Sequence, residues 1–379
     1  MVAAILLAPA ANRSFAQESP QAAKKPKPPS LWVLNETYGY DISIFQAAQL
    51  SQKTGTVAAS GLSANQGRTS AFTFASGGAL WLGVCNPSGD SGFIADLTPA
   101  ALRQLVLFGS AAYGAVIQDP NKTGNPQYLS CALGLAFDPL GNLWVEVNPT
   151  ASEALPTLIE YKSAQLVTGR PTPAAVIEMP TPTSEPVDLV FDSSGNLWQA
   201  AGGTVFEFTA AQLLAGEQTD PYQTLNLDEV SPGLSYPQAI AFDSSHNLWV
   251  AFGLGGTAGN FGGLEMFPAD KLGGSGTVMP DPMVTINAST VVYHVSHVKS
   301  YDFTSFNGPA AMAFDTAGDL WVGNSLQPAA ALGAGSLVEF AASQLSTSGS
   351  PAPVRAILAN RHDTNLGSPR YMTFGPALP

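Results

Sequence analysis

Histidines in two long connecting segments are the side chains of this chain best suited to proton transfer. His294 and His297 lie in the segment 287–308, and His362 lies in a later segment that also leads towards a new strand. An imidazole gains or loses a proton near neutral pH and also binds metal ions. The candidate catalytic residues are therefore these three histidines, His294, His297 and His362, together with Arg370. The His-x-x-His spacing of His294 and His297 is also a signal for a metal site, with loop packing or surface hydrogen bonding as the alternative.

A charged rim is the second candidate for chemistry. At one inner position most copies of a repeated phrase carry Ala or Gly, whereas two copies carry Asp188 and Tyr371. Glu185 and Arg370 lie beside these two positions in the chain. Asp188, Glu185 and Arg370 are expected to hold a divalent cation or an anionic ligand, or else to form a solvated ion pair. Ca²⁺ or Mg²⁺ would need oxygen ligands, and Asn148 is a further candidate ligand at the end of a strand, with turn capping as its alternative.

The repeated phrase indicates how these residues are positioned. Its clearest copies are GLAFDPLGNLWVEV (134–147), DLVFDSSGNLWQAA (188–201), AIAFDSSHNLWVAF (239–252) and AMAFDTAGDLWVGN (311–324). Each of the chain's tryptophans follows a leucine in such a copy: Trp32, Trp81, Trp144, Trp198, Trp249 and Trp321. A period of roughly 50 residues predicts one structural unit copied around an axis. We expect the six indole rings to pack between neighbouring units as core, not to form a binding cage.

One complete unit predicts four short β-strands. These are Ala239–Phe242, Leu248–Phe252, Leu264–Phe267 and Met283–Asn287. Turn residues separate the strands, and a recurring phrase such as FTAAQL predicts one helical turn between the third and fourth. In the Asp-x-x-Gly-Asn turn after the first strand, Asp and Asn are expected to bond to backbone, since a Gly there supplies positive φ. His246 occupies that glycine position in one copy.

The copies predict an all-β fold, namely a six-bladed β-propeller of four-stranded antiparallel blades. The chain enters a unit at its second strand, Leu31–Val33, and ends in a first strand, Arg370–Phe374. The C-terminal strand is therefore expected to join the N-terminal blade and close the ring. Residues 31–379 form this single domain, residues 17–30 a Pro/Lys linker, and residues 1–16 a signal peptide.

Export is predicted by the first residues and agrees with the cysteines. Val2–Pro9 is a short apolar run, and Ser14–Ala16 is a cleavage site of the small-x-small type. Cys85 follows a second strand and Cys131 precedes the first strand of the next blade, so the two ends should share one face of the ring. A disulfide between them or two separate buried thiols are both open. We expect a secreted or periplasmic protein.

Composition and loop lengths limit the partners. The net charge of −13 argues against a nucleic-acid partner, since the sequence has no basic stripe to neutralise phosphates. Beyond the signal-like start, no apolar run is long enough to span a bilayer. The loops between second and third strands and the blade crossings vary widely in length. Because they leave the ring at one end, which we call the variable face, a protein, glycan or small-molecule ligand is expected there. No Gly-x-Ser-x-Gly elbow supports a hydrolase triad.

The repeated phrase has the consensus FDSSGNLWVA and is preceded by a proline, as at Pro186, Pro237 and Pro309. It resembles NHL-type propeller repeats and those of the streptogramin lyase family. The blade count is similar to NHL proteins and the SMP-30/gluconolactonase group. The lyase resemblance implies a histidine base and a magnesium-bound carboxylate. The lactonase resemblance implies a central cation held by Glu, Asn and Asp, for which Glu185, Asn148 and Asp188 fit best.

Two hypotheses of function follow from these features. The first is a secreted binding or scaffold module that acts through its variable face. The second is a metal-dependent lyase or lactonase-type hydrolase with its site at the channel mouth. The sequence leaves open whether the protein is an enzyme.

Overall fold

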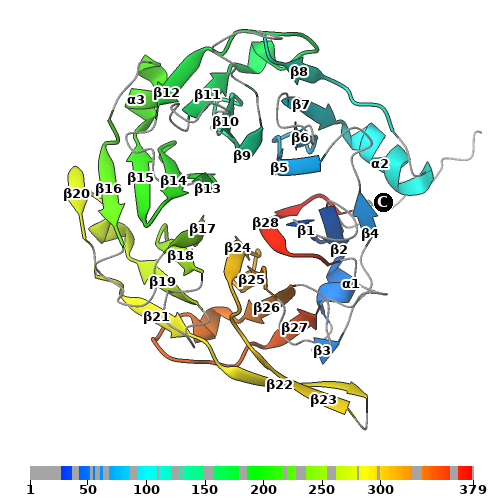
Figure 1. Cartoon of the computed structure of the whole chain (residues 1–379), viewed down its shortest axis with the longest axis vertical. Helices are drawn as coiled ribbons and strands as arrows, with labels where there is room; N and C mark the ends of the chain where they lie inside the picture. The colour runs from blue at the N-terminus through cyan, green and yellow to red at the C-terminus, as the bar shows by residue number, and fades with distance from the viewer. Residues whose placement is uncertain are drawn as a thin grey trace, which may run out of the picture.

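The structure is a computed structural model, and it shows six blades around a central axis (Figure 1). Each blade is an antiparallel sheet whose first strand lies innermost, which confirms the predicted six-bladed β-propeller. The residues that the structure describes are 27–35, 42–51, 54–55, 60–62, 68–85, 92–108, 111–120, 129, 131–147, 157–178, 186–216, 220–227, 236–253, 262–279, 281–296, 299–326, 335–358 and 366–377.

The first three blades contain the strands nearest the N-terminus and, in blade 1, the C-terminal strand. Blade 1 consists of β28 (Pro369–Gly375), β1 (Ser30–Asn35), β2 (Ile42–Phe45) and β4 (Ser60–Leu62). Blade 2 consists of β5 (Arg68–Phe74), β6 (Leu80–Cys85), β7 (Gly92–Leu97) and β8 (Val116–Gln118). Blade 3 consists of β9 (Ala132–Phe137), β10 (Leu143–Val147), β11 (Thr157–Tyr161) and β12 (Ala175–Glu178).

The other three blades repeat this order from the inside of the ring outwards. Blade 4 consists of β13 (Pro186–Phe191), β14 (Leu197–Ala201), β15 (Thr204–Phe208) and β16 (Gln223–Asn226). Blade 5 consists of β17 (Pro237–Phe242), β18 (Leu248–Phe252), β19 (Gly263–Phe267) and β21 (Val284–Asn287). Blade 6 consists of β24 (Pro309–Phe314), β25 (Leu320–Asn324), β26 (Ser336–Phe340) and β27 (Arg355–Leu358).

The ring closes within blade 1, as the sequence predicts. Strand β28 pairs antiparallel with β1, so that Trp32 lies opposite Thr373 and Leu34 opposite Tyr371. The C-terminal strand thereby becomes the innermost strand of a blade that otherwise comes from the N-terminus. Blade 1 thus has the same inner edge as the others.

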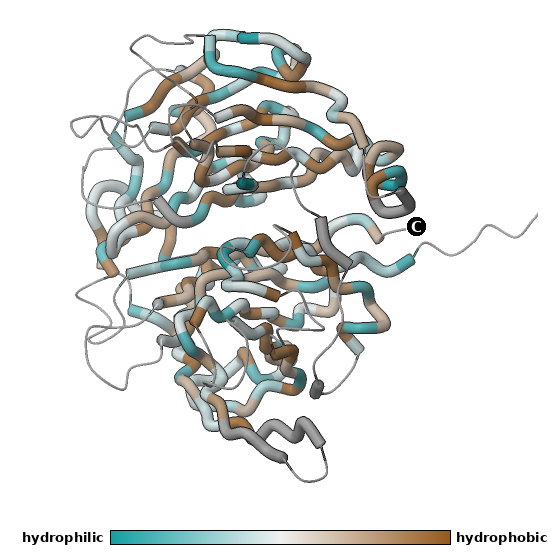
Figure 2. The backbone as a smooth tube through the Cα atoms, turned by 45° about the vertical axis from the view of Figure 1, so that its right-hand side comes forward, coloured by the Kyte–Doolittle hydropathy of each residue, from teal (hydrophilic) through white to brown (hydrophobic). Residues whose placement is uncertain are grey.

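The core consists of six clusters between neighbouring blades, and one tryptophan lies in each. All six indole side chains are buried, with at most 5% exposed at Trp81. Four make edge-on contacts with the phenylalanine that ends the first strand of the next blade: Trp32–Phe74, Trp81–Phe137, Trp198–Phe242 and Trp249–Phe314. Burial of one indole contributes up to about 4–6 kcal/mol, and the brown segments within the blades in Figure 2 mark this apolar interior.

The turn between the first two strands is held by its own aspartate, as predicted. Asp192 accepts hydrogen bonds at Oδ1 from the backbone N–H groups of Ser194 (2.8 Å) and Asn196 (2.9 Å). Its Oδ2 accepts from Asn196 Nδ2 and Trp198 Nε1, both at 3.0 Å. Asp243 makes the same four bonds in blade 5. The repeated aspartate thus connects the turn to the buried indole. We call the end of the ring that carries these turns the turn face.

Short helices connect the third and fourth strands at the same end. They are α1 (Ala47–Leu50), η1 (Ser163–Gln165), α3 (Ala210–Ala215), η2 (Ala269–Lys271) and η3 (Ala342–Gln344). Gln212 accepts from the backbone N–H of Thr209 at 2.9 Å and donates to the carbonyl of Asp220 at 2.9 Å. Gln165 and Gln344 bridge their helices in the same way. The glutamine of the AAQL phrase therefore fixes the entry and exit of the connection.

Short arms between these helices and the outer strands reach back to the preceding blade. Strand β20 (Gly276–Val278) of blade 5 pairs parallel with β16 of blade 4, and β3 (Thr54–Gly55) of blade 1 pairs parallel with β27 of blade 6. Single parallel bridges do the same at Gly169–Ile117 and Gly349–Ile286. The arms cover outer edges that would otherwise expose unpaired backbone groups.

Two elements differ from a simple repeat. The connection in blade 2 is a helix of ten residues, α2 (Pro99–Phe108). The blade crossing 287–308, expected as a loop, contains the hairpin of β22 (Thr290–Ser296) and β23 (Lys299–Thr304). This hairpin lies at the periphery of the ring in Figure 1.

Cys85 and Cys131 form a disulfide with a Cα–Cα distance of 4.9 Å. It joins the end of β6 in blade 2 to the residue before β9 in blade 3, on the variable face. Among the described residues, no helix is both long and apolar enough to cross a membrane.

Candidate functional site

Every innermost strand carries a β-bulge at the same level near the variable face. In β28 the register shifts between Pro369 and Tyr371, and the other five inner strands shift at the matching place. The bulged residues are Ser70, Leu133, Val187, Gln238, Ala310 and Arg370. A bulge leaves its extra residue outside the regular pairing, so all six inner strands are irregular at one level near the variable face.

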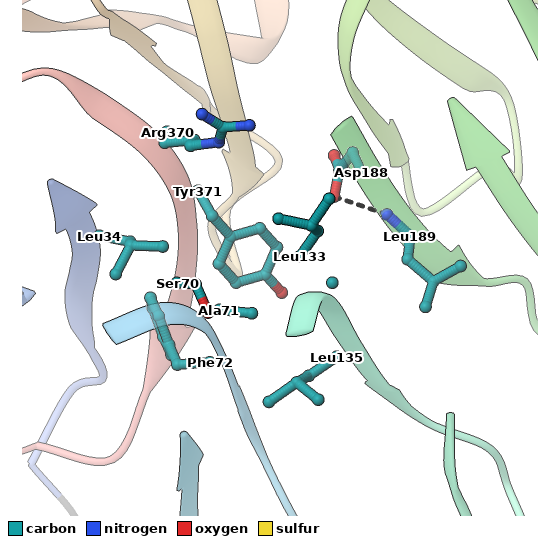
Figure 3. A pocket seen from close by; sticks show the side chains of 11 residues that line it. Leu34, Ser70, Ala71, Phe72, Leu133, Leu135, Asp188, Leu189, Arg370 and Tyr371 are labelled. Carbon is teal, nitrogen blue, oxygen red and sulfur yellow. Dashed lines mark hydrogen bonds between the residues drawn. The ribbon is translucent and has the colours of Figure 1, made fainter. Parts of the chain in front are cut away.

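The next residue of each inner strand forms a second layer just below the bulges. This layer consists of Ala71, Gly134, Asp188, Ala239, Ala311 and Tyr371. A narrow cavity opens here between blades 1 to 4, lined by Arg370, Tyr371 and Asp188 among apolar neighbours (Figure 3). It has room for about one water molecule. Only a small group of a ligand can therefore enter it.

Asp188 accepts hydrogen bonds from buried backbone N–H groups of two blades. Its Oδ1 accepts from the N–H of Leu189 at 2.9 Å, and its Oδ2 accepts from the N–H of Ile240 in blade 5 at 2.8 Å. The side chain is 8% exposed. Burial raises its pKa from 3.8 to about 6, although the two backbone hydrogen bonds oppose that rise. Asp188 can thus change protonation close to neutral pH.

A second buried acid lies behind this layer. Glu146 of β10 is fully buried and accepts from the Nε2 of Gln199 in blade 4, which is also fully buried. Burial raises the pKa of Glu146 well above 4.5, and the nearby Asp188 raises it further, while Gln199 and Arg370 lower it. Its Oε2 has no hydrogen-bond partner among the described residues, so the neutral acid is favoured.

The space for Glu146 is provided by a glycine. Gly134 lies directly opposite Glu146 in the pairing of β9 with β10. A Cβ at Gly134 would lie 2.7 Å from Glu146 Oε2, which is closer than real contacts allow. The absence of a side chain at Gly134 therefore lets the carboxyl group approach the channel wall.

Tyr371 and Arg370 form the opposite side of the cavity. The Tyr371 ring lies edge-on to Phe72 with centroids 5.1 Å apart. Burial raises the pKa of its hydroxyl, and Asp188 raises it further, so the phenol stays neutral. In Figure 3 the hydroxyl of Tyr371 points into the cavity, and the Arg370 side chain lies above the ring. A neutral hydroxyl, a guanidinium and an ionisable carboxyl group thus share one site.

The structure brings together two of the residues predicted as a rim, because Asp188 and Arg370 line the same cavity. Glu185, Asn148, His297 and His362 lie outside the described residues. His294 belongs to β22, whose backbone lies at the periphery next to β3 and away from the channel mouth (Figure 1). His246 occupies the glycine position of its turn with φ of 64°, as expected, and contacts Ser193 at 3.2 Å.

Sequence reasoning missed Glu146 and Gln199, although a signal was present. Two residues after the tryptophan, where Glu146 lies, the other copies carry Leu, Gly or Ala. One residue after the tryptophan, where Gln199 lies, the others carry Val or Leu. Both positions are buried, so a polar residue there departs from the repeat and needs a partner. Each supplies that partner for the other.

The site fits a polar ligand better than a divalent cation. Both oxygens of Asp188 already accept backbone hydrogen bonds, and the Arg370 guanidinium lines the same cavity. Ca²⁺ prefers six to eight oxygen ligands, and a neighbouring positive charge opposes its binding. Asn35 and Asn324, which end second strands, use their amides on neighbouring protein groups.

Among the described residues, one group of three carboxylates lies close together at the turn face, namely Asp315, Asp319 and Glu339. Asp319 occupies the position where the turns of blades 3, 4 and 5 carry Asn, and Glu339 is paired with Arg355. The burial of Glu339 raises its pKa, Arg355 lowers it, and the two aspartates raise it again. This group lies at the opposite end of the blade from the channel mouth.

Comparisons with known proteins support the architecture alone. No protein-family model and no curated protein matches the sequence. A protein of unknown function from Bacteroides caccae aligns with a TM-score of 0.53 and 12% identity, over 93% of this chain and 100% of that one. A protein from Lactobacillus plantarum aligns with a TM-score of 0.51 and 11% identity, over 92% of this chain and 99% of that one.

A calcium-binding protein, regucalcin from Agrobacterium tumefaciens, aligns with a TM-score of 0.42 and 11% identity, over 78% of this chain and 85% of that one. Similarity at this level supports no statement about function. The fold and the site define the class of this protein as a six-bladed β-propeller with a polar channel mouth. The resemblances to named propeller families stay predictions.

Proposed function

We propose that the protein is an exported binding module that captures a small polar ligand at the channel mouth of its variable face. The observation that carries this proposal is the concentration of unusual polar residues in one sector of the inner ring. Asp188, Arg370 and Tyr371 line one cavity, whereas the positions that match Asp188 and Tyr371 carry alanine in blades 2, 5 and 6. Export is supported by the leader-like start of the chain and by the disulfide, because disulfides persist in oxidising compartments.

The chemistry of the three side chains suits a ligand rich in hydroxyl groups. A guanidinium donates, an ionised carboxyl accepts, and a neutral phenol does either. Because the cavity has room for a group about the size of a water molecule, one hydroxyl of a larger ligand fits into it. The rest of the ligand then lies on the rim of the variable face.

The proposal is tested by thermal unfolding of the mature protein with neutral sugars, hydroxy acids and simple lactones. A ligand that binds the folded ring raises Tm. We expect such a rise in the wild type and its loss in Arg370→Ala, since that variant removes the cationic donor from the cavity. Arg103→Ala, which changes an arginine of α2 away from the channel, is the control. A Tm rise that survives Arg370→Ala would place the binding site elsewhere.

A metal-dependent lyase or lactonase-type enzyme is the second candidate, favoured by the pKa of about 6 for Asp188. A carboxyl group with that pKa can exchange a proton near neutral pH. The same unfolding measurement with EDTA, followed by Ca²⁺ or Mg²⁺, tests for the cation. Lactone turnover that depends on the cation and on Asp188 would support this candidate. If the cation neither shifts Tm nor supports turnover, the enzyme candidate is wrong and the binding module remains.

A further inference from the structure

We propose that Tyr236 is an aromatic contact of the channel-mouth site and that the ligand it recognises is a neutral oligosaccharide. This inference rests on the proposed function and names the class of its ligand. It begins with an unusual backbone. Among the described residues only Tyr236 and His246 have positive φ without being glycine, and Tyr236 has φ of 68°. A bulky residue in this left-handed region is a genuine outlier.

The repeat itself shows which residue this backbone prefers. Gly308 precedes Pro309 at the start of β24, just as Tyr236 precedes Pro237 at the start of β17, and Gly308 also has φ of 68°. The carbonyl of Gly308 accepts from Ser325 N at 2.8 Å, and that of Tyr236 accepts from Gly253 N at 3.2 Å. The two residues are equivalent, so Tyr236 occupies a glycine position and adopts a conformation that costs it energy.

The tyrosine ring does not repay this cost by packing in the core. Tyr236 is 57% exposed, although it is one of the largest side chains in blade 5. Strained residues persist where they serve a site, and exposed aromatic rings on a rim are frequent binding contacts. The strain and the exposure of Tyr236 therefore point to selection for its ring on the surface.

Its location connects the ring with the proposed site. Ala239, three residues further along β17, belongs to the same layer as Asp188 in blade 4, and Ile240 donates to Asp188. An extended chain rises about 3.3 Å per residue, so Tyr236 lies within about 10 Å of that layer, towards the variable face. Between them lies Gln238, the bulged residue of β17, whose side chain packs over Gly253. A ligand that touches Tyr236 and the cavity must therefore span several polar groups.

A neutral oligosaccharide matches this arrangement. The apolar C–H face of a sugar ring stacks on a tyrosine ring, and its hydroxyls bond to amide, guanidinium and carboxyl groups such as those of Gln238, Arg370 and Asp188. The net charge of −13 disfavours nucleic acid and other polyanions. A chain of sugar units also has the length that separates the rim from the cavity.

The test measures binding and stability in the same variants. Isothermal titration calorimetry is performed on the mature protein with maltohexaose, cellohexaose and chitohexaose. We expect one of them to bind the wild type, Tyr236→Gly to weaken it by about tenfold or more, and Tyr236→Phe to retain it. Tyr236→Gly should at the same time raise Tm by about 1–3 °C, because glycine adopts this φ without strain. Tyr222→Ala, which removes another exposed tyrosine outside the ring, is the matched control.

The outcomes separate this inference from the proposed function. If a hexasaccharide binds and Arg370→Ala abolishes binding while Tyr236→Gly does not, the channel-mouth site stands and Tyr236 is not part of it. If Tyr236→Gly weakens binding but Arg370→Ala does not, the sugar binds away from the cavity and the proposed function is wrong. Binding of none of the three sugars, or a fall in Tm on Tyr236→Gly, overturns the inference. Binding of an aromatic peptide instead would likewise overturn it.

Discussion

The turn face and the channel mouth lie at opposite ends of the same strands, and they use acidic side chains in different ways. At the turn face Asp192 satisfies four donors within its own blade and stays near the surface. At the channel mouth Asp188 accepts from two blades, is buried, and has a raised pKa. An aspartate at the position of Asp192 recurs in every clear copy of the repeat, whereas an aspartate at the position of Asp188 occurs in one copy.

This difference teaches where to look for function in a repeat. A residue that recurs around the ring meets the same structural need in each blade, so it explains the fold. A residue that departs from its equivalents at a buried position must be explained by its own surroundings. Glu146, Gln199, Asp188 and Tyr371 all depart from the repeat, and they belong to blades 1, 3 and 4, on the side of the channel where the cavity lies.

Removing the disulfide is the strongest test of this difference between structural and functional residues, because the disulfide is a structural bond that lies on the variable face. Cys85 and Cys131 are separated by 46 residues, and closing such a loop in the unfolded chain stabilises the fold by about 4 kcal/mol. We expect Cys85→Ala/Cys131→Ala to lower the free energy of unfolding by about 2–4 kcal/mol in urea. Ligand binding at the channel mouth should persist below the new melting temperature. If the variant is folded but no longer binds the ligand, the disulfide also determines the geometry of the site.

At the turn face we expect Asp192→Ala to lower the free energy of unfolding by about 2–4 kcal/mol, since it leaves the buried Trp198 Nε1 and two backbone N–H groups without their acceptor. Chemical denaturation followed by tryptophan fluorescence measures this change. Asp281→Ala, at an exposed aspartate, should have an effect near zero. Equal effects of the two variants would contradict the structural role of the repeated aspartate.

At the channel mouth, replacing an aspartate should raise the free energy of unfolding instead of lowering it. The folded-state pKa of Asp188, about 6, exceeds its ordinary 3.8, so the folded protein binds this proton more tightly than the unfolded chain. The resulting stability is fully present below pH 3.8 and is lost as pH rises through 6, a difference of about 3 kcal/mol. Asp188→Asn should therefore stabilise the protein by about 1–3 kcal/mol at pH 7.5.

The same variant should bring no gain at pH 3.5, because the wild-type carboxyl is then neutral too. Urea denaturation at the two pH values measures both effects. A variant that is less stable than the wild type at pH 7.5 would mean that the two accepted hydrogen bonds outweigh the burial of the charge.

The smallest expected effect concerns a departure at the turn face. Asp319 lies where other turns have Asn, so Asp315 there faces a second carboxylate instead of an amide donor. Asp319→Asn restores the common turn and should stabilise the protein by about 0.5–1 kcal/mol, as measured by the urea midpoint. Asn247→Asp, the reverse change in blade 5, should destabilise by a similar amount. A destabilised Asp319→Asn would indicate that the carboxylate cluster has a role of its own.

The sequence predicts the architecture well because its signals are local and repeated. The phrase with its tryptophan predicts strand, turn and strand, and the incomplete ends predict that β28 joins β1. It also places Asp188 and Arg370 on one rim. The arms and the contact of Glu146 with Gln199 join residues about 50 or more positions apart in the chain, so no pattern within one repeat shows which residues meet. The hairpin β22–β23 is missed because it lies outside the repeated four-strand unit, although its Val and Tyr residues favour strands.

The arms determine where the ring can be divided into parts. The outer strand β16 of blade 4 acquires its last partner from β20, at residues 276–278, after the first three strands of blade 5 have already passed. A cut at the boundary between blades 4 and 5 therefore takes from β16 its partner β20, and it leaves β20 in the other fragment without a strand to pair with. Fragments for dissection, or new termini for a rearranged chain, should lie beyond the arm. In this protein the unit that can be separated is longer than the unit that is repeated.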